Sequence, residues 1–178
     1  MEIALIWAQD RSGGIGTGDS MAWHVPADFT HFRACTTGCP IIMGRRTFDS
    51  LGRRCLPGRH SIVLTGDPTL EAPPATIVHS LDQALAACAG ETEPAWIIGG
   101  AHLYAQALPL ASTLVVTTVD LPGHLPVRAP EIPQSQWRRV PGDAERTGWR
   151  SGLVSDPDGT WREKSGDARW RVDVWERA

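Results

Sequence analysis

The repeated alternation of short apolar strand patterns with helical patterns is the feature that most constrains the fold. An apolar run at residues 2–9 predicts a buried first strand. Further patterns follow in turn, with strands at 40–43, 60–65, 76–79, 95–98 and 113–120 and helices at 47–52, 81–89 and 101–108. Alternation of this kind is typical of an α/β domain, in which helices cover a mostly parallel sheet.

Four segments add to this pattern. Residues 10–20, rich in Gly, Ser and Asp, predict an irregular loop that is long enough to have a function. Pro26 and Asp28 open a helix, because proline suits the first turn and an acid suits the positive end of the helix dipole. The Trp-rich tail after the proline-rich residues 121–133 predicts an antiparallel hairpin at the sheet edge, and residues 155–167 predict a surface loop.

Composition excludes several classes of protein. With 178 residues, of which 42% are hydrophobic, the chain is expected to form one domain over residues 1–178. Its apolar runs are far shorter than the roughly 20 residues that cross a bilayer, and no secretory signal pattern precedes the first strand, so we expect a soluble cytoplasmic protein without membrane partners. The net charge of -3, without a basic block interleaved with aromatic residues, argues against nucleic acid as a partner.

The four cysteines indicate neither a metal site nor disulfides. Cys35, Cys39, Cys55 and Cys88 form no C-x-x-C pair and have no histidine at zinc-ligand spacing. Reduced thiols, partly buried, are the simplest interpretation in a domain without secretory marks. We therefore predict no bound metal.

Two junctions between a strand and a helix are candidate phosphate sites. One runs through Gly44 into Arg45 and Arg46, and the other passes through Gly99 and Gly100. Backbone N–H groups at a helix start and guanidinium groups bind anions, but ordinary turn and capping roles explain each junction equally well by itself. Two such junctions one strand-helix unit apart suit a dinucleotide, and arginine suits the 2′-phosphate of NADP.

Asp28 has two interpretations. An acid in the first turn of a helix most often serves the helix dipole. However, Trp23, Phe29 and Phe32 give this carboxylate unusually apolar company. Such company keeps a role in ligand binding open, although the helix dipole is the commoner explanation of an acid at this position.

Six ordered segments carry a resemblance to the bacterial dihydrofolate reductase family over nearly the whole chain: LIWAQD, GGIG, WHVPADFTHF, IIMGRRTFDSLGRRCLPGR, WIIGGAHLY and VVTTVD. The resemblance implies a single-domain fold with a central, mostly parallel eight-stranded sheet flanked by helices, and an antiparallel C-terminal hairpin. It implies an oxidoreductase of one-carbon metabolism, an antifolate target, that reduces 7,8-dihydrofolate to 5,6,7,8-tetrahydrofolate with NADPH. We expect a monomer whose partners are dihydrofolate and antifolates.

The resemblance also implies which residues act on the substrate. Asp28, Trp23 and Thr117 are the implied catalytic residues, with Asp28 gripping the pterin and promoting water-delivered protonation of N5, and Arg59 is expected to bind the glutamyl tail. The full set of implied substrate contacts is Ile6, Ala8, Asp28, Phe29, Phe32, Leu51, Leu56, Arg59, Ile98 and Thr117.

Cofactor contacts are implied on the other side of the site, including a cis Gly99-Gly100 peptide bond and a loop that covers the active site and excludes water. They are Ala8, Ile15, Gly16, Met21, Gly44, Arg45, Arg46, Thr47, Leu64, Thr65, Gly99, Gly100, Ala101, His102, Leu103 and Tyr104.

The sequence departs from the family pattern mainly in the residues that should hold this loop. Ala22 replaces the proline before Trp23, and residues 128–131, Arg-Ala-Pro-Glu, stand where the family often has an Asp-Thr pair. Loop closure is therefore expected to use other contacts or to be looser. Two alternatives stay open: an NADPH-dependent reductase of the riboflavin-pathway type that acts on a related pyrimidine or pterin, and a non-catalytic homologue that binds NADPH and antifolates.

Overall fold

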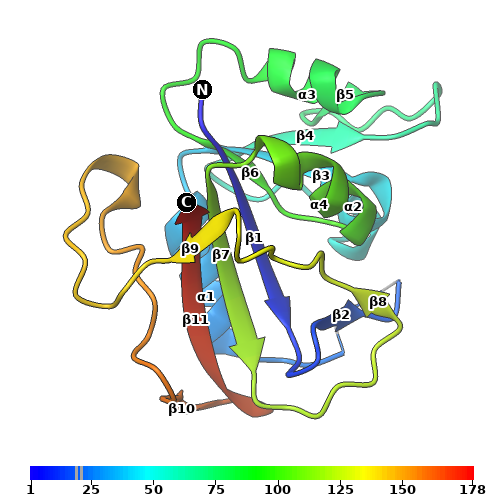
Figure 1. Cartoon of the computed structure of the whole chain (residues 1–178). Helices are drawn as coiled ribbons and strands as arrows, with labels where there is room; N and C mark the ends of the chain where they lie inside the picture. The colour runs from blue at the N-terminus through cyan, green and yellow to red at the C-terminus, as the bar shows by residue number, and fades with distance from the viewer. Residues whose placement is uncertain (19, 21) are drawn as a thin grey trace.

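The structure, a computed structural model, describes residues 1–18, 20 and 22–178, and its centre is one large twisted sheet (Figure 1). Eight strands follow one another across this sheet in the order β10-β11-β7-β1-β6-β3-β4-β5, and β9 pairs with β11 beside that path. Their bounds are β1 Ile3–Gln9, β3 Pro40–Gly44, β4 His60–Leu64, β5 Thr76–Val78, β6 Ala95–Ile97, β7 Thr113–Val119, β9 Trp137–Arg139, β10 Arg162–Ser165 and β11 Ala168–Arg177.

The strands from β7 to β5 are all parallel, whereas the C-terminal strands run antiparallel. β1 pairs in parallel with both β6 and β7, and β3 joins β4 to β6 in the same direction. β11 pairs antiparallel with β7, β9 and β10. The predicted eight-stranded, mostly parallel sheet with an antiparallel hairpin is therefore confirmed, and β9 is an addition to it.

Helices cover both faces of the sheet because successive strand residues point to opposite sides. Ile41 belongs to the core cluster that includes Phe48 of α2, whereas its neighbour Ile42 belongs to the cluster that includes Ala84 of α3. α1 and α2 thus lie on one face, and α3 and α4 on the other. Their bounds are α1 Pro26–Thr36, α2 Arg45–Ser50, α3 Leu81–Ala87 and α4 Ala101–Ala107, with short 3₁₀ turns η1 Leu108–Leu110 and η2 Gly148–Arg150.

Two segments predicted to be irregular contain strands. Within residues 10–20, β2 (Gly14–Gly16) pairs antiparallel with β8 (Val127–Arg128). Within residues 155–167, β10 pairs with β11 across a tight turn. Neither strand has the alternating apolar pattern that would have predicted it. β2 depends on backbone pairing with a partner far along the chain, and β10 on pairing across a turn. The helix expected at 47–52 also begins earlier, at Arg45.

The helices of the described residues are all too short or too polar to cross a membrane. Nor do those residues gather three or more His, Cys, Asp or Glu side chains into a possible metal site.

Candidate active site

A cleft of about 1050 Å³ opens at the carboxyl ends of the parallel strands, where the starts of α1, α2 and α4 meet. Parallel α/β sheets bind ligands at this edge, so it is the expected position for a site. The predicted site residues all line the cleft, apart from Trp23, which packs in the core cluster, and Met21, which lies outside the described residues. The structure therefore places nearly all of the predicted site residues around one cleft.

Asp28 forms the acidic floor of this cleft. Its side chain points inward from the first turn of α1, only 8% of the residue is exposed, and its Oδ1 accepts a 2.6 Å hydrogen bond from the Thr117 hydroxyl of β7. Asp67, the other acidic residue of the described lining, lies at the far rim beyond β4. Among the described residues that line the cleft, Asp28 is therefore the one buried carboxylate.

Burial raises the pKa of Asp28 above its ordinary value, although the Thr117 hydrogen bond and the Arg162 guanidinium act in the opposite direction. Arg162 lies on β10, where its guanidinium stacks over Trp170 at 4.4 Å. Burial, helped by Arg162, lowers the pKa of His31 to about 4, and burial raises the pKa of the Cys35 thiol to about 12. Both side chains of α1 are therefore uncharged near neutral pH, and neither lines the cleft.

The apolar walls differ in part from the expectation. Phe32 and Leu51 are partly buried against the core, as their predicted role requires. Phe29 lines the cleft but remains 46% exposed, because α1 turns it toward the cleft mouth. Trp23 is 6% exposed and belongs to a core cluster rather than to the cleft lining, and its catalytic role stays a prediction.

The starts of α2 and α4 face each other at the opposite end of the cleft. The Gly44 N–H donates a 2.8 Å hydrogen bond to the Gly99 carbonyl, and the Gly99-Gly100 peptide bond is cis, as predicted. Gly99 has a φ of 128°, a region that residues with a side chain rarely adopt. Arg45 and Arg46 are exposed just beyond Gly44 and leave their guanidinium groups free to face an anion from the solvent side.

Tyr104 fixes the wall between these two ends. Its hydroxyl, which is buried, donates a 2.7 Å hydrogen bond to the backbone carbonyl of Ile6. Burial also raises the pKa of this phenol, so it stays protonated. α4 is thereby held against β1 at the centre of the cleft.

Arg59 lies at the mouth of the cleft beside Phe32. Its guanidinium donates to the Thr36 hydroxyl at 3.1 Å and lies 6.0 Å from the centre of the Phe32 ring. Burial and the neighbouring Arg33 lower its pKa, which remains that of a strong base. Arg33 also lines the cleft, although the sequence-based set omitted it; its helical spacing from Phe29 and Phe32 was the available signal.

Other lining residues lacked a usable sequence signal. Trp7, Ser50 and Gln106 line the cleft only because the sheet and the helices bring their segments to the same edge. Val127 lines it because β8 pairs with β2, a contact that joins residues more than a hundred positions apart. Local pattern carries no information on such pairings.

Arg128 supplies a contact where the family's loop-holding pair is absent. Its guanidinium donates to the hydroxyl of Ser12 at 2.9 Å and also to the Ser12 carbonyl, and the next N–H, of Ala129, donates to Gly13 at 2.9 Å. The Asp10 carboxylate accepts hydrogen bonds from the Ser12 N–H and hydroxyl, both at 2.8 Å. The glycine-rich loop is therefore held by contacts other than the family's Asp-Thr pair, which was one of the two expected arrangements.

A cleft that combines one buried carboxylate with two helix starts suited to phosphate is typical of an α/β enzyme with a dinucleotide cofactor. A family profile described as dihydrofolate reductase matches residues 2–151, a range that ends before β10 and β11. The chain belongs to the dihydrofolate reductase family, and it is an oxidoreductase that depends on NADPH.

Individual relatives agree with this assignment. The chain is 45% identical to the dihydrofolate reductase of Neisseria gonorrhoeae over 147 residues, which cover 83% of this chain and 88% of that protein. It is 41% identical to that of Mycobacterium tuberculosis over 172 residues, or 95% of this chain and 88% of the relative. A solved dihydrofolate reductase from Enterococcus faecalis, in complex with NADP(H) and RAB-propyl, superimposes with a TM-score of 0.80 at 28% identity and covers 99% of this chain and 96% of that one.

Proposed function

We propose that the chain reduces 7,8-dihydrofolate to 5,6,7,8-tetrahydrofolate in the cleft around Asp28, with hydride added at C6 and a proton at N5. The observation that carries the proposal is the buried Asp28 carboxylate, hydrogen-bonded through Oδ1 to Thr117 and set among apolar side chains. A flat, largely apolar ring with adjacent N–H donors on one edge is complementary to such a pocket.

Asp28 is proposed to hold the pterin by its edge. An ionised carboxylate accepts two hydrogen bonds, from the ring N3–H and the 2-amino group, each worth roughly 1.5–3 kcal/mol. The Thr117 hydroxyl, 2.6 Å from Oδ1, keeps the carboxylate in one orientation. The ring would then lie between the walls that Phe32 and Leu51 provide.

The proton for N5 is proposed to come from water. Asp28 grips the edge of the pterin remote from N5, so direct transfer from its carboxyl is geometrically awkward. Its negative charge in a weakly polar pocket instead favours the protonated ring electrostatically. The loop that contains Ile15 and Gly16 lines the cleft and would limit the access of bulk water.

The opposite end of the cleft fits the cofactor. NADPH supplies the hydride when bound, and its phosphates need N–H donors and cations. Gly44 and Gly100 have no side chains, so the starts of α2 and α4 can approach a phosphate closely, and Arg45 and Arg46 add exposed guanidinium groups beside them. The arginines are proposed to recognise the 2′-phosphate, and Thr65, which follows β4, to contact the adenosine end.

Arg59 is proposed to bind the glutamyl carboxylate of the substrate, because a guanidinium fork pairs with a carboxylate through two parallel hydrogen bonds. Its Nε already donates to the Pro57 carbonyl at 3.0 Å, and this bond, together with the bond to Thr36, fixes the plane of the guanidinium. Arg33 adds a second positive charge at the same mouth.

The chain is further proposed to act as a cytoplasmic monomer of one domain on small molecules rather than on nucleic acid. Among the described residues, Met1, Phe29 and Leu110 are the large hydrophobic side chains that are exposed, and Phe29 faces the cleft, so the surface offers little area for a stable subunit contact. The four cysteines are free thiols, as expected in a reducing compartment. The net charge of -3 disfavours a polyanionic partner.

NADPH oxidation with dihydrofolate as the substrate, followed by absorbance, tests the proposal. We expect turnover that methotrexate abolishes, and a loss of orders of magnitude at pH 7 in Asp28→Asn, with Asp143→Asn, an exposed acid remote from the cleft lining, as the matched control. Wild-type turnover in Asp28→Asn would contradict the role of Asp28. Binding of NADPH and methotrexate without turnover would indicate the non-catalytic alternative, and turnover of a ribosylamino-pyrimidine instead would indicate the riboflavin-pathway alternative.

A further inference from the structure

The helix that carries Asp28 has no cap of its own. Val25, at its N-cap position, makes no side-chain capping hydrogen bond, and Pro26 has no N–H, so Ala27 has the first free backbone donor of α1. The Ala27 N–H instead donates a 3.0 Å hydrogen bond to the hydroxyl of Ser165, which lies 138 positions further along the chain. Ser165 thus provides on β10 the bond that an N-cap residue usually makes locally.

The turn between β10 and β11 fits closely against the segment that leads into α1. The His24 N–H donates to Asp167 Oδ2 at 2.7 Å, and the Asp167 N–H donates to the His24 carbonyl at 2.9 Å. Gly166, with a φ of 58°, lies so near that a Cβ there would overlap the His24 carbonyl oxygen and come within 2.9 Å of Pro26 Cδ. The turn and the start of α1 are therefore one packed unit.

The same hairpin supports the hydrogen-bond partner of Asp28. β11 begins at Ala168, directly after the turn, and pairs Val172 with Thr117 of β7. The 2.6 Å hydrogen bond from Thr117 to Asp28 is consequently held at both ends, through the β11–β7 ladder on one side and through Ser165 and Ala27 on the other. A shift of the turn would alter the position of the carboxylate relative to Thr117.

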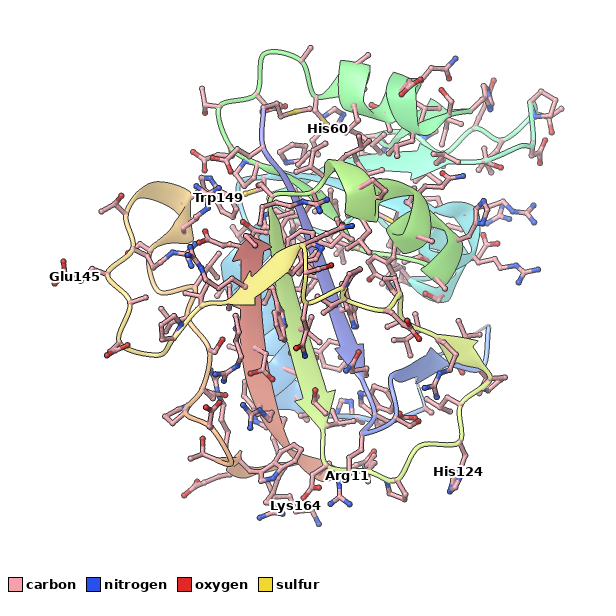
Figure 2. The ribbon with its side chains drawn as sticks, viewed as in Figure 1. Arg11, His60, His124, Glu145, Trp149 and Lys164 are labelled. Carbon is pink, nitrogen blue, oxygen red and sulfur yellow. The ribbon has the colours of Figure 1, made fainter. Side chains whose placement is uncertain are left out.

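We propose that Ser165 is a positioning residue for the reduction, which fixes the Asp28 carboxylate in the pterin pocket by capping α1 from the β10–β11 hairpin. The inference rests on the proposed function of Asp28. Ser165 is not among the residues that line the cleft, so its effect must pass through α1. Lys164, its neighbour on β10, is exposed and points away from the body of the molecule (Figure 2), so the hairpin faces the helix with Ser165 and the solvent with Lys164.

The test compares Ser165→Ala with Ser165→Thr. Loss of the cap hydroxyl is expected to raise KM for dihydrofolate about fivefold, the fold-change that corresponds to an ordinary capping contribution, while KM for NADPH stays unchanged. Ser165→Thr retains a hydroxyl and should restore most of the wild-type KM. Asp28 is proposed to contact dihydrofolate and not NADPH. A rise in KM for dihydrofolate without a rise in KM for NADPH therefore distinguishes a positioning role from general destabilisation.

Ser80→Ala is the matched control, because the Ser80 hydroxyl caps α3 by accepting a 3.1 Å hydrogen bond from the Gln83 N–H, and no described residue of α3 lines the cleft. It should lower Tm comparably and leave both KM values unchanged. Gly166→Ala, which forces the turn away from His24, should likewise raise KM for dihydrofolate and leave KM for NADPH unchanged. It provides the test if Ser165→Ala does not fold. Equal rises in both KM values, or unchanged KM values in Ser165→Ala, would overturn the inference; absence of dihydrofolate reduction by the wild-type protein would instead overturn the proposed function.

Discussion

The Thr117 hydroxyl donates a 2.6 Å hydrogen bond to Asp28 Oδ1 and so joins the central strand β7 to the first turn of α1 at the floor of the cleft. Two opposing effects meet in this pair. Burial raises the pKa of the Asp28 carboxyl, whereas the hydrogen bond stabilises the charged form and lowers it. The fraction of ionised Asp28, and with it the strength of pterin binding, therefore depends on Thr117.

Thr117→Val removes this hydrogen bond with little change in shape. The pKa of Asp28 should rise further, so the neutral form of the carboxyl persists to higher pH. Pterin binding through an ionised carboxylate is lost as the pH falls through this pKa, and the acid limb of the kcat/KM profile for dihydrofolate should move to higher pH. At pH 7 we expect kcat/KM to fall by about tenfold or more, which corresponds to the loss of one charge-assisted hydrogen bond.

The control for this substitution is Thr118→Val, on the same strand but facing the other side of the sheet. It should leave the pH profile in place. A Thr117→Val enzyme whose acid limb coincides with that of the wild type would show that the hydroxyl does not tune the carboxyl.

Asp28→Asn should make the ligand-free protein more stable at neutral pH. The folded-state pKa of Asp28 lies above the ordinary value of 3.8, so the folded protein binds more protons than the unfolded chain in the window between the two values. The wild-type protein therefore loses stability as the pH rises through that window, by about 1.4 kcal/mol for each unit of pKa difference. The neutral amide escapes this cost, although it weakens the Thr117 contact.

Urea denaturation of the two ligand-free proteins at several pH values measures the effect. The advantage of Asp28→Asn should be present at pH 7 and disappear below about pH 3, where the wild-type carboxyl is protonated in both states because the pH lies well under the ordinary pKa of 3.8. A constant difference across this range would mean that it does not arise from ionisation. Asp143→Asn should show no comparable gain at pH 7.

The sheet could be predicted from the sequence where local pattern encodes it. The apolar runs around Ile41 and Ile97 are buried on both faces, so they read directly as central strands of a parallel sheet. β2 and β10 could not be predicted in this way. Gly14 pairs with Arg128 and Arg162 with Trp170, and the hydrogen bonds of such pairs depend on chain topology rather than on any local alternation.

The cleft could be predicted where side chains follow strands or open helices, as at Asp28 and Gly99. The supports of the site were less accessible. Ser165 and Arg162 act on α1 from a polar segment that predicts only a surface loop, and no spacing in the sequence relates them to Asp28. Trp23 shows that a recognisable motif does not by itself place a side chain in the cleft, because this residue packs into the core and is not part of the cleft lining.

Replacing Arg45 and Arg46 with Gln, singly and together, should reduce the preference for NADPH over NADH. Each guanidinium that contacts a phosphate through a charge-assisted hydrogen bond contributes roughly 1.5–3 kcal/mol, so each loss should cost about tenfold or more in that preference. KM for dihydrofolate should not change. Arg53→Gln, which breaks only the exposed 2.7 Å pair with Asp49, is the control; an unaltered preference in the double variant would exclude both arginines from 2′-phosphate recognition.

Arg128→Ala should loosen the loop that walls the cofactor end of the cleft. Arg128 donates to the Ser12 hydroxyl at 2.9 Å and to the Ser12 carbonyl, and the loop leads directly into β2, whose Ile15 and Gly16 line the cleft. Without these bonds, the loop keeps its backbone pairing with β8, the Ala129–Gly13 bond and the bonds to Asp10, but it loses its side-chain contacts with Arg128, so the open loop should become more populated.

The expected result is faster dissociation of NADPH and slower single-turnover hydride transfer, each by several-fold, with little change in Tm because the contact is exposed. Stopped-flow measurement of NADPH release and of the first turnover checks both quantities. Arg128→Lys retains the charge but not the guanidinium fork that reaches both Ser12 oxygens, so it should resemble Arg128→Ala more than the wild type. Arg138→Ala, an exposed arginine on β9, should leave both rates unchanged. Wild-type rates in Arg128→Ala would show that the loop closes without the bonds between Arg128 and Ser12.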